Sequence, residues 1–146
     1  MRSANEISAM VLKAARGAVM PLGCAEELSR AAPNLMAAGA LGQVPELLSR
    51  PFEPPSLTRG AICGGHPVLA VIAWRDFIAA GQELGLECEV TSELKTAMIE
   101  LASPVGPFDV DAALWEQLES YANKMLVPES EASRLGGAGA GLTDND

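Results

Sequence analysis

The sequence predicts an α+β fold that is mostly α-helical, with about five helices and at most a small sheet in a single compact domain over residues 1–146. A chain of 146 residues suits one domain with one core. Apolar residues recur at helical spacing in several segments, whereas the strict alternation of a half-buried strand is confined to one short stretch. Aromatic residues make up only 4% of the chain, so aliphatic side chains must fill this core.

The first helix is predicted to begin after Ser3. Ser3 and Glu6 have the spacing of a capping box, in which each side chain accepts a hydrogen bond from the other residue's backbone N–H. Lys13 and Arg16 are expected to face solvent, and Gly17 is expected to end the helix in a left-handed conformation. The predicted buried face consists of Ile7, Met10, Val11, Ala14 and Ala18.

The second helix is predicted to begin at Pro21, with Glu26 and Glu27 near its positive end. Pro33 is expected to kink or end this helix, because proline removes a backbone hydrogen bond and clashes with the preceding turn. The predicted buried residues are Leu22, Ala25, Leu28 and Leu35.

The middle of the chain is predicted to begin with an extended surface connection over residues 50–58, which contain three prolines and separate two halves of the domain. A buried helix from Pro67 to about Ala80 follows and is expected at the centre of the core. Gly81 closes it. Alternation at Leu86, Cys88 and Val90 predicts a strand, and residues 92–101 are predicted to be helical.

The last predicted helix begins at Asp109 or Asp111 and ends before Pro128. Glu116, Glu119 and Lys124 are expected to stay outside. Its apolar face is predicted to comprise Leu114, Trp115, Leu118, Tyr121, Ala122 and Met125. A glycine-rich segment, residues 133–146, follows this helix.

The charge and the cysteine content limit which partners and which cellular compartment are expected. Ten Lys and Arg stand against nineteen Asp and Glu, a net charge of −9, so neither nucleic acid nor an anionic membrane is an expected partner. Charged residues interrupt any signal-peptide core, and no apolar run is long enough to span a bilayer. The odd number of cysteines, Cys24, Cys63 and Cys88, suits a reducing compartment. We therefore expect a cytoplasmic protein, with homo-oligomerisation left open.

Cys63 and His66 are the candidates for nucleophilic chemistry. A thiol ahead of the helix at Pro67 would feel its positive end and become more acidic, with His66 as the base. Alternatively, His66 caps that helix and Cys63 is a small buried apolar side chain. A structural zinc would require Cys24 and Cys88 to converge on the same pair, and because the sequence lacks a second close-spaced ligand pair, no metal or cofactor is expected.

The C-terminal glycines fail the tests for a nucleotide loop. Gly136 and Gly141 have the Walker spacing, but Leu142 stands where lysine must reach the phosphates. Gly137, Gly139 and Gly141 imitate a dinucleotide fingerprint that a helix and strand would have to follow, yet only five residues remain.

Three interpretations of this segment stay open. In the first, Arg134 binds a carboxylate or phosphate, or Asp144 and Asp146 chelate a cation. In the second, Arg134 pairs locally with Glu131 or Asp144 and the glycines allow close packing. In the third, the segment is a loose tail.

Three blocks of the sequence resemble bacterial proteins grouped as domain of unknown function 3726. They are residues 5–18, residues 21–32 and residues 127–146, about a third of the chain. This chain departs from the family pattern in a shorter middle and in Pro33-Asn34, where a helix is expected to continue. The resemblance implies no activity, but it favours a definite role for the C-terminal segment. The family's marked positions correspond to Asn5, Glu6, Lys13, Arg16, Gly17, Glu26, Glu27, Arg30, Pro128, Glu131, Ser133, Arg134, Gly137, Gly139, Gly141, Asp144 and Asp146.

These residues lead to one hypothesis about the site, in which polar residues of the first two helices and the C-terminal segment converge on one ligand. The ligand-binding candidates are Glu6, Lys13, Arg16, Glu26, Glu27, Arg30, Glu131, Ser133, Arg134, Gly137, Gly139 and Asp144. The alternative is a set of helix-face charges that pair locally.

Two classes of function remain. The favoured one is a non-catalytic accessory protein that docks an unknown protein partner or holds a small anion, because no nucleophile, metal or cofactor motif is complete. The alternative is a small hydrolase, lyase or isomerase of a carboxylated metabolite, with Glu26 or Glu131 as general base and Arg134 as substrate clamp.

Overall fold

The computed structural model describes residues 1–87, 94–95, 98–99 and 104–125. Helices dominate this part of the chain and a three-stranded sheet accompanies them, so the predicted α+β, mostly helical class is confirmed. The α-helices are α1 (Ala4–Gly17), α2 (Leu22–Ala37), α3 (Val44–Leu48), α4 (Pro67–Ala79) and α6 (Ala112–Ala122). The short 3₁₀ helices are η1 (Leu41–Gln43) and η2 (Asn123–Met125), and the strands are β1 (Ser56–Thr58), β2 (Ala61–Cys63) and β3 (Gly85–Glu87).

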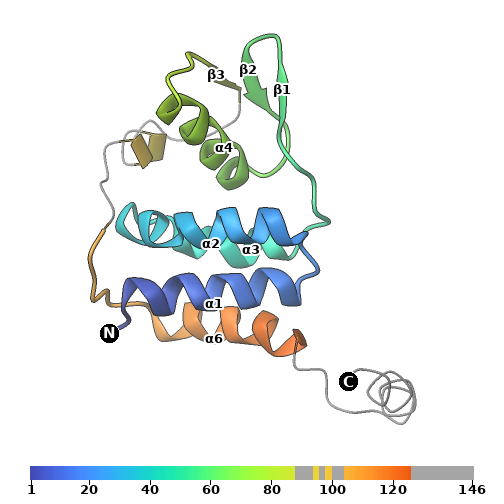
Figure 1. Cartoon of the computed structure of the whole chain (residues 1–146). Helices are drawn as coiled ribbons and strands as arrows, with labels where there is room; N and C mark the ends of the chain where they lie inside the picture. Colours follow the sequence, from blue (N-terminus) through green and yellow to red (C-terminus); the bar gives the residue numbers. More distant parts are fainter. Residues whose placement is uncertain (88–93, 96–97, 100–103, 126–146) are drawn as a thin grey trace, which may run out of the picture.

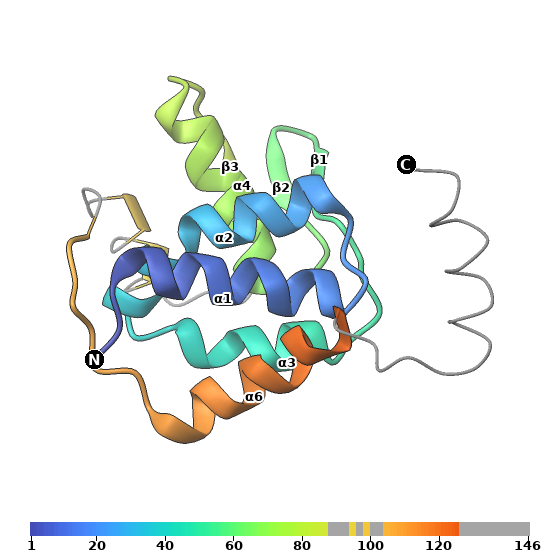
Figure 2. The same ribbon diagram turned by 60° about the horizontal axis from the view of Figure 1, so that its bottom comes forward.

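The helices are stacked in layers, with α1 between α2 and α6 (Figure 1). A second view shows α3 beside α6, with α4 and the sheet beyond α2 (Figure 2). The prediction that α4 forms the centre of the core is therefore wrong. The central position belongs to α1, which contacts α2 on one side and α6 on the other, and whose residues Ile7, Val11, Ala14 and Ala15 are fully buried.

The start of α1 follows its sequence signals. The Ser3 backbone N–H donates to Glu6 Oε2 at 2.8 Å, and the Glu6 N–H donates to Ser3 Oγ at 3.1 Å, which confirms the capping box. Its end differs, because the left-handed residue is Val19, at φ 66°, and not Gly17. Gly17 instead permits a close helix contact: a Cβ there would lie 2.8 Å from the carbonyl carbon of Tyr121 in α6 and closer still to its oxygen.

In α2 one residue that was predicted to be buried is exposed, and of the two outcomes predicted for Pro33, a kink or a helix end, the end does not occur. Leu22 is 53% exposed, because it lies in the first turn at the end of the α1–α2 pair, whereas the predicted core residues Ala25, Leu28 and Leu35 are buried. Pro33 does not end the helix, which continues to Ala37. Pro33 is itself buried among core residues, and this packing offsets the backbone hydrogen bond that proline removes.

The connection at residues 50–58 runs along the surface as predicted, and its last three residues form the extended strand β1. β1 pairs antiparallel with β2 through a two-residue turn in which Arg59 and Gly60 have positive φ, as a tight hairpin requires. β3 joins β2 in parallel, with Ile62 opposite Leu86. The predicted strand thus includes Leu86, while Cys88 and Val90 lie outside the described residues.

The predicted helix at residues 92–101 lies mostly outside the described residues. Its described members Leu94, Lys95, Met98 and Ile99 are helical. The preceding helix, α4, ends as predicted, with Gly81 at φ 83°.

The last helix, α6, is capped by Asp111, whose carboxylate accepts the Leu114 N–H at 3.1 Å. Trp115, Leu118 and Ala122 are buried as predicted, but Met125 is 50% exposed. The chain changes from α to 3₁₀ geometry at Asn123, and the tighter winding rotates Met125 off the buried face.

The N-terminal residues pack against the segment that leads into α6. The backbone of Arg2 exchanges two hydrogen bonds with Phe108, at 2.8 and 2.7 Å, and its guanidinium lies 4.2 Å above the Trp115 ring. In the described part of the chain, no helix combines the length and apolar character needed to cross a bilayer.

Candidate functional site

Two of the candidate residues in α1 have local structural partners. Glu6 belongs to the capping box, and these hydrogen bonds from Ser3, together with the nearby Arg2, lower the pKa of its carboxyl. Arg16 donates a hydrogen bond to the Met20 carbonyl at 3.0 Å and so closes the turn between α1 and α2. Both residues therefore stabilise the helical hairpin.

The candidates in α2 are exposed along that helix. Glu26, Glu27 and Arg30 form no ion pair with another residue of the described ranges. Burial raises the pKa of the Cys24 thiol, and the negative charge of Glu27 adds to this effect. A thiol with a raised pKa is a weaker nucleophile at neutral pH, so Cys24 is not an activated cysteine.

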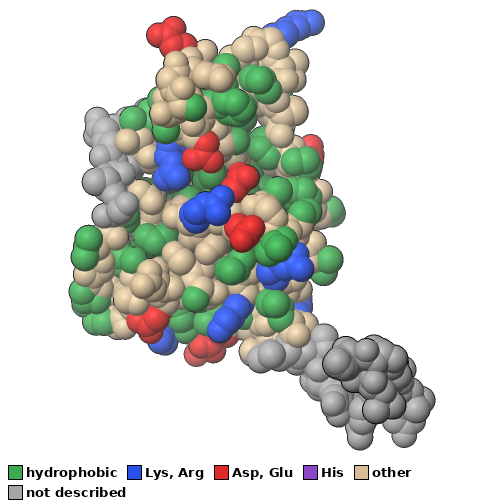
Figure 3. All heavy atoms as spheres, in the orientation of Figure 1, with side chains coloured by type: hydrophobic (Ala, Val, Ile, Leu, Met, Phe, Trp, Pro, Cys, Tyr) green, Lys and Arg blue, Asp and Glu red, His purple; other side chains and the backbone are tan. Residues whose placement is uncertain are grey.

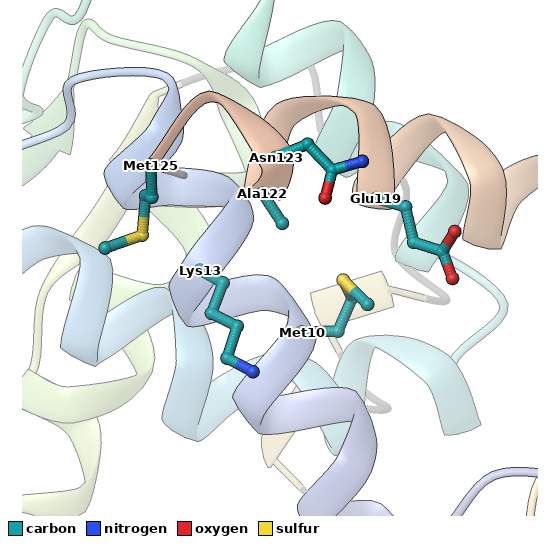
Figure 4. A pocket seen from close by; sticks show the side chains of 6 residues that line it. All are labelled: Met10, Lys13, Glu119, Ala122, Asn123 and Met125. Carbon is teal, nitrogen blue, oxygen red and sulfur yellow. The ribbon is translucent and has the colours of Figure 1, made fainter. Parts of the chain in front are cut away.

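Lys13 lines a pocket of about 340 Å³ between α1 and the end of α6, which we call the Lys13 pocket. Its lining residues are Met10, Lys13, Glu119, Ala122, Asn123 and Met125 (Figure 4). The Lys13 ammonium extends along α1, while the Glu119 carboxylate points away from it on α6. Within the described residues Lys13 has no ion-pair partner, so this pocket combines a free cation with apolar walls.

The candidates of the C-terminal block lie outside the described residues. They are Glu131, Ser133, Arg134, Gly137, Gly139 and Asp144. The described chain ends with Met125, which itself lines the Lys13 pocket. The segment that carries these residues thus continues from the edge of this pocket, and its convergence with the N-terminal helices stays a prediction.

A second hollow, which we call the Glu46 groove, lies between α3 and α6 and measures about 490 Å³. It is lined by Gly42, Pro45, Glu46, Ser49, Gln117, Ser120, Tyr121 and Lys124. Glu46 Oε1 lies 2.6 Å from His66 Nε2, and its other oxygen contacts Arg50. The hydrogen bond from His66, with the charge of Arg50, lowers the pKa of the Glu46 carboxyl, so this wall carries a fixed negative charge.

His66 is the N-cap of α4, as the second interpretation of the Cys63–His66 pair requires. Its Nδ1 accepts the Val68 N–H at 3.1 Å, so the ring carries its proton on Nε2 and donates it to Glu46. Both nitrogens of this buried ring are therefore occupied. Cys63 is half-buried beside Ser56, with 3.8 Å between Sγ and Oγ. The geometry favours a structural role for His66 over that of a base for Cys63.

Sequence reasoning missed the contributions of α6 and η2. Glu119 was expected to be an ordinary solvated charge and Met125 a core residue, yet both line the Lys13 pocket. Glu46 was not a candidate at all. The contact between α1 and α6 is indicated in the sequence only by Gly17 at the end of α1. A glycine at this position is also typical of an ordinary helix end, so it does not predict the contact.

Charge is mixed over the face of the molecule seen in Figure 3, where acidic and basic side chains alternate across the helical layers. This face therefore carries no extended field of one sign. Among the residues that the structure describes, no three His, Cys, Asp or Glu side chains are grouped as a metal site would require. Cys88, one of the thiols weighed for zinc, lies outside these residues.

The fold and its hollows thus define a small, mostly helical α+β protein in which the Lys13 pocket and the Glu46 groove both lie beside α6. Residues 2–49, the first third of the chain, match the model of a family described as "Protein of unknown function (DUF3726)". The resemblance seen in the sequence is thereby confirmed for α1 and α2, and the match extends through η1 and α3. No curated protein and no solved structure matches the chain significantly.

Proposed function

We propose that this chain is a non-catalytic accessory protein that binds a small anion in the Lys13 pocket, with Arg134 of the C-terminal segment as the second cation. The observation that carries this proposal is the position of Lys13. It is a free cation within the described residues, and it lines a pocket whose edge is the residue from which the C-terminal segment continues.

The walls of the pocket define the kind of anion. Met10, Ala122 and Met125 are apolar, so a carboxylate or phosphate that also carries an apolar part fits better than a bare ion. An overall charge of −9 opposes anion binding, so the local cations must supply the affinity.

Glu119 explains why a second cation is needed. Its carboxylate belongs to the same pocket and repels an anion held at Lys13. A guanidinium placed between the two negative groups offsets this repulsion and donates paired hydrogen bonds to the ligand. Arg134 follows the last described residue, Met125, by nine positions, and an extended chain over nine positions spans about 30 Å, enough to return to the pocket.

Methionine methyl NMR on the full chain tests the proposal, because Met10 and Met125 line the pocket while Met20 and Met36 do not. We expect inorganic phosphate and butyrate to shift the Met10 and Met125 signals saturably and to leave the other two unchanged. Lys13→Ala and Arg134→Ala should each weaken binding about tenfold, the effect of losing one charged hydrogen bond.

The matched control is Arg59→Ala, which removes one positive charge from the exposed turn between β1 and β2, outside the pocket, and should leave binding unchanged. Equal losses of affinity in Lys13→Ala and Arg59→Ala would mean that only the net charge matters, which would contradict the assignment. Conversion of an added carboxylate into a product during the titration would favour the enzymatic alternative instead.

A further inference from the structure

The Glu46 groove contains fixed charges of opposite sign on two elements. Glu46 is on α3, where His66 and Arg50 hold its carboxylate, and Lys124 is on η2, where its ammonium lies 4.6 Å from the centre of the Tyr121 ring. Both line the groove, and they form no ion pair with each other. The groove thus offers an anionic and a cationic anchor at once.

Two side chains, His66 and Arg50, hold the Glu46 carboxylate in one orientation, which is unusual for a surface carboxylate. His66 is 6% exposed, and its ring is fixed because Nδ1 accepts the Val68 N–H while Nε2 donates to Glu46. A carboxylate oxygen can accept two hydrogen bonds, so each Glu46 oxygen keeps one free lone pair beside the contacts with His66 and Arg50. The carboxylate is therefore oriented in advance and still able to accept donors from a ligand.

Neutral polar groups complete the lining. The side chains of Gln117, Ser120 and Tyr121 line the groove from α6 and form no side-chain hydrogen bond within the described ranges. Tyr121 is half-buried, and the Lys124 ammonium lies against its ring. The volume of about 490 Å³ falls in the range of small-molecule sites.

From this arrangement we propose that the Glu46 groove binds a free α-amino acid with a small or polar side chain. The ligand ammonium donates to Glu46, and the ligand carboxylate accepts from Lys124 and from the hydroxyls of Ser120 and Tyr121. The polar lining disfavours a large aliphatic side chain, which would find only Pro45 and one face of Tyr121 to cover it. This site is separate from the Lys13 pocket and does not depend on the function proposed there.

Saturation-transfer NMR with the full chain and the twenty free amino acids provides the test. We expect serine, threonine, asparagine or glutamine to bind, and leucine and isoleucine to bind at least tenfold more weakly. The best ligand is then compared with its N-acetyl derivative, which lacks the ammonium, and with its amide, which lacks the carboxylate. Each derivative should lose at least tenfold in affinity, because each loses one charged hydrogen bond.

Two variants examine the anchors separately. In Lys124→Gln the amide should bind as well as the free amino acid, because the cation that prefers the carboxylate is gone. In Glu46→Gln the N-acetyl derivative should bind as well as the free amino acid, because the anion that prefers the ammonium is gone. Glu116→Gln, which neutralises an exposed carboxylate of α6 outside the groove, is the control and should change nothing. The proposal is overturned if no amino acid binds, if both derivatives bind as well as the parent, or if Lys124→Gln leaves the preference for the free acid intact.

Discussion

The contact between α1 and α6 depends on the absence of a side chain at Gly17. An ideal Cβ at this position would lie 2.8 Å from the Tyr121 carbonyl carbon and 3.5 Å from the Ala122 Cα, and it would overlap the Tyr121 oxygen. These neighbours are backbone atoms of a helix, so they cannot rotate away as a side chain does. Gly17→Ala must therefore push α6 away from α1.

The cost follows from the packing that such a shift disturbs. Trp115, Leu118 and Ala122 are the buried residues of α6, and a gap of about 1 Å forfeits up to half of each dispersion contact they make. Overpacking of this kind typically costs 1–3 kcal/mol, and a backbone obstacle belongs at the upper end, about 3 kcal/mol. At a urea m-value of about 2 kcal/mol per molar, the midpoint of unfolding falls by about 1.5 M.

Gly23 of α2 supplies the matched control. It is also a helical glycine, but a Cβ there would meet nothing within 4 Å. Gly23→Ala should therefore stabilise the protein by about 0.5 kcal/mol through helix propensity alone. Urea unfolding followed by far-UV circular dichroism measures both variants. Wild-type stability in Gly17→Ala, or equal shifts in the two variants, would refute the reasoning.

Three further predictions concern the backbone and the Glu46–His66 pair. Val19 has φ 66° and is 85% exposed, so Val19→Gly should relieve backbone strain and raise stability by about 1 kcal/mol, measured as a higher melting temperature; a lower one would count against it. His66 lowers the pKa of the Glu46 carboxyl below its ordinary 4.5, so Glu46 contributes stability above that pH and loses it as the pH falls through the lowered pKa. Urea midpoints should thus separate wild type from Glu46→Gln near neutral pH and converge below pH 4.5, whereas a gap independent of pH would disagree. His66→Asn should keep the cap of α4 and leave the alkylation rate of Cys63 unchanged, whereas His66→Ala should cost about 1 kcal/mol; slower alkylation in His66→Asn would revive the thiol–imidazole pair.

Local signals in the sequence predicted local structure well. The capping box at Ser3 and Glu6, the cap at Asp111 and the His66-Pro67 start of α4 each depend on atoms only a few residues apart, and each forms as expected. Such contacts need no knowledge of the fold. Helix periodicity likewise identified most buried residues of α1 and α6, but only Ala25, Leu28 and Leu35 of the eight buried residues of α2.

The errors arose where a distant contact decides the outcome. Gly17 looks like a helix stop, but its role is set by Tyr121, over a hundred residues away in the chain. Pro33 normally breaks a helix, yet the core around it holds the turn together. The sequence did not predict a site at Glu46, because its partner His66 and the groove walls on α6 come together only in the folded chain.

The candidate site was only partly accessible to sequence reasoning for the same reason. Lys13 was selected among polar residues of the terminal blocks, but its pocket is made by Glu119, Asn123 and Met125, which carry no motif. Glu6 and Arg16 have the same residue types as ligand-binding groups, yet their partners are local. Residue type and spacing alone cannot separate these two roles.

The most direct test of the central claim is a nuclear Overhauser measurement from the Met10 methyl group, which lines the Lys13 pocket. The full chain, labelled at its methionine methyls and at residues 126–146, is examined with and without saturating phosphate. We predict contacts between the Met10 methyl and residues near Arg134 that strengthen with phosphate and disappear in Lys13→Ala. Contacts confined to α1, α6 and η2 in both conditions would contradict the claim that the C-terminal segment completes this site.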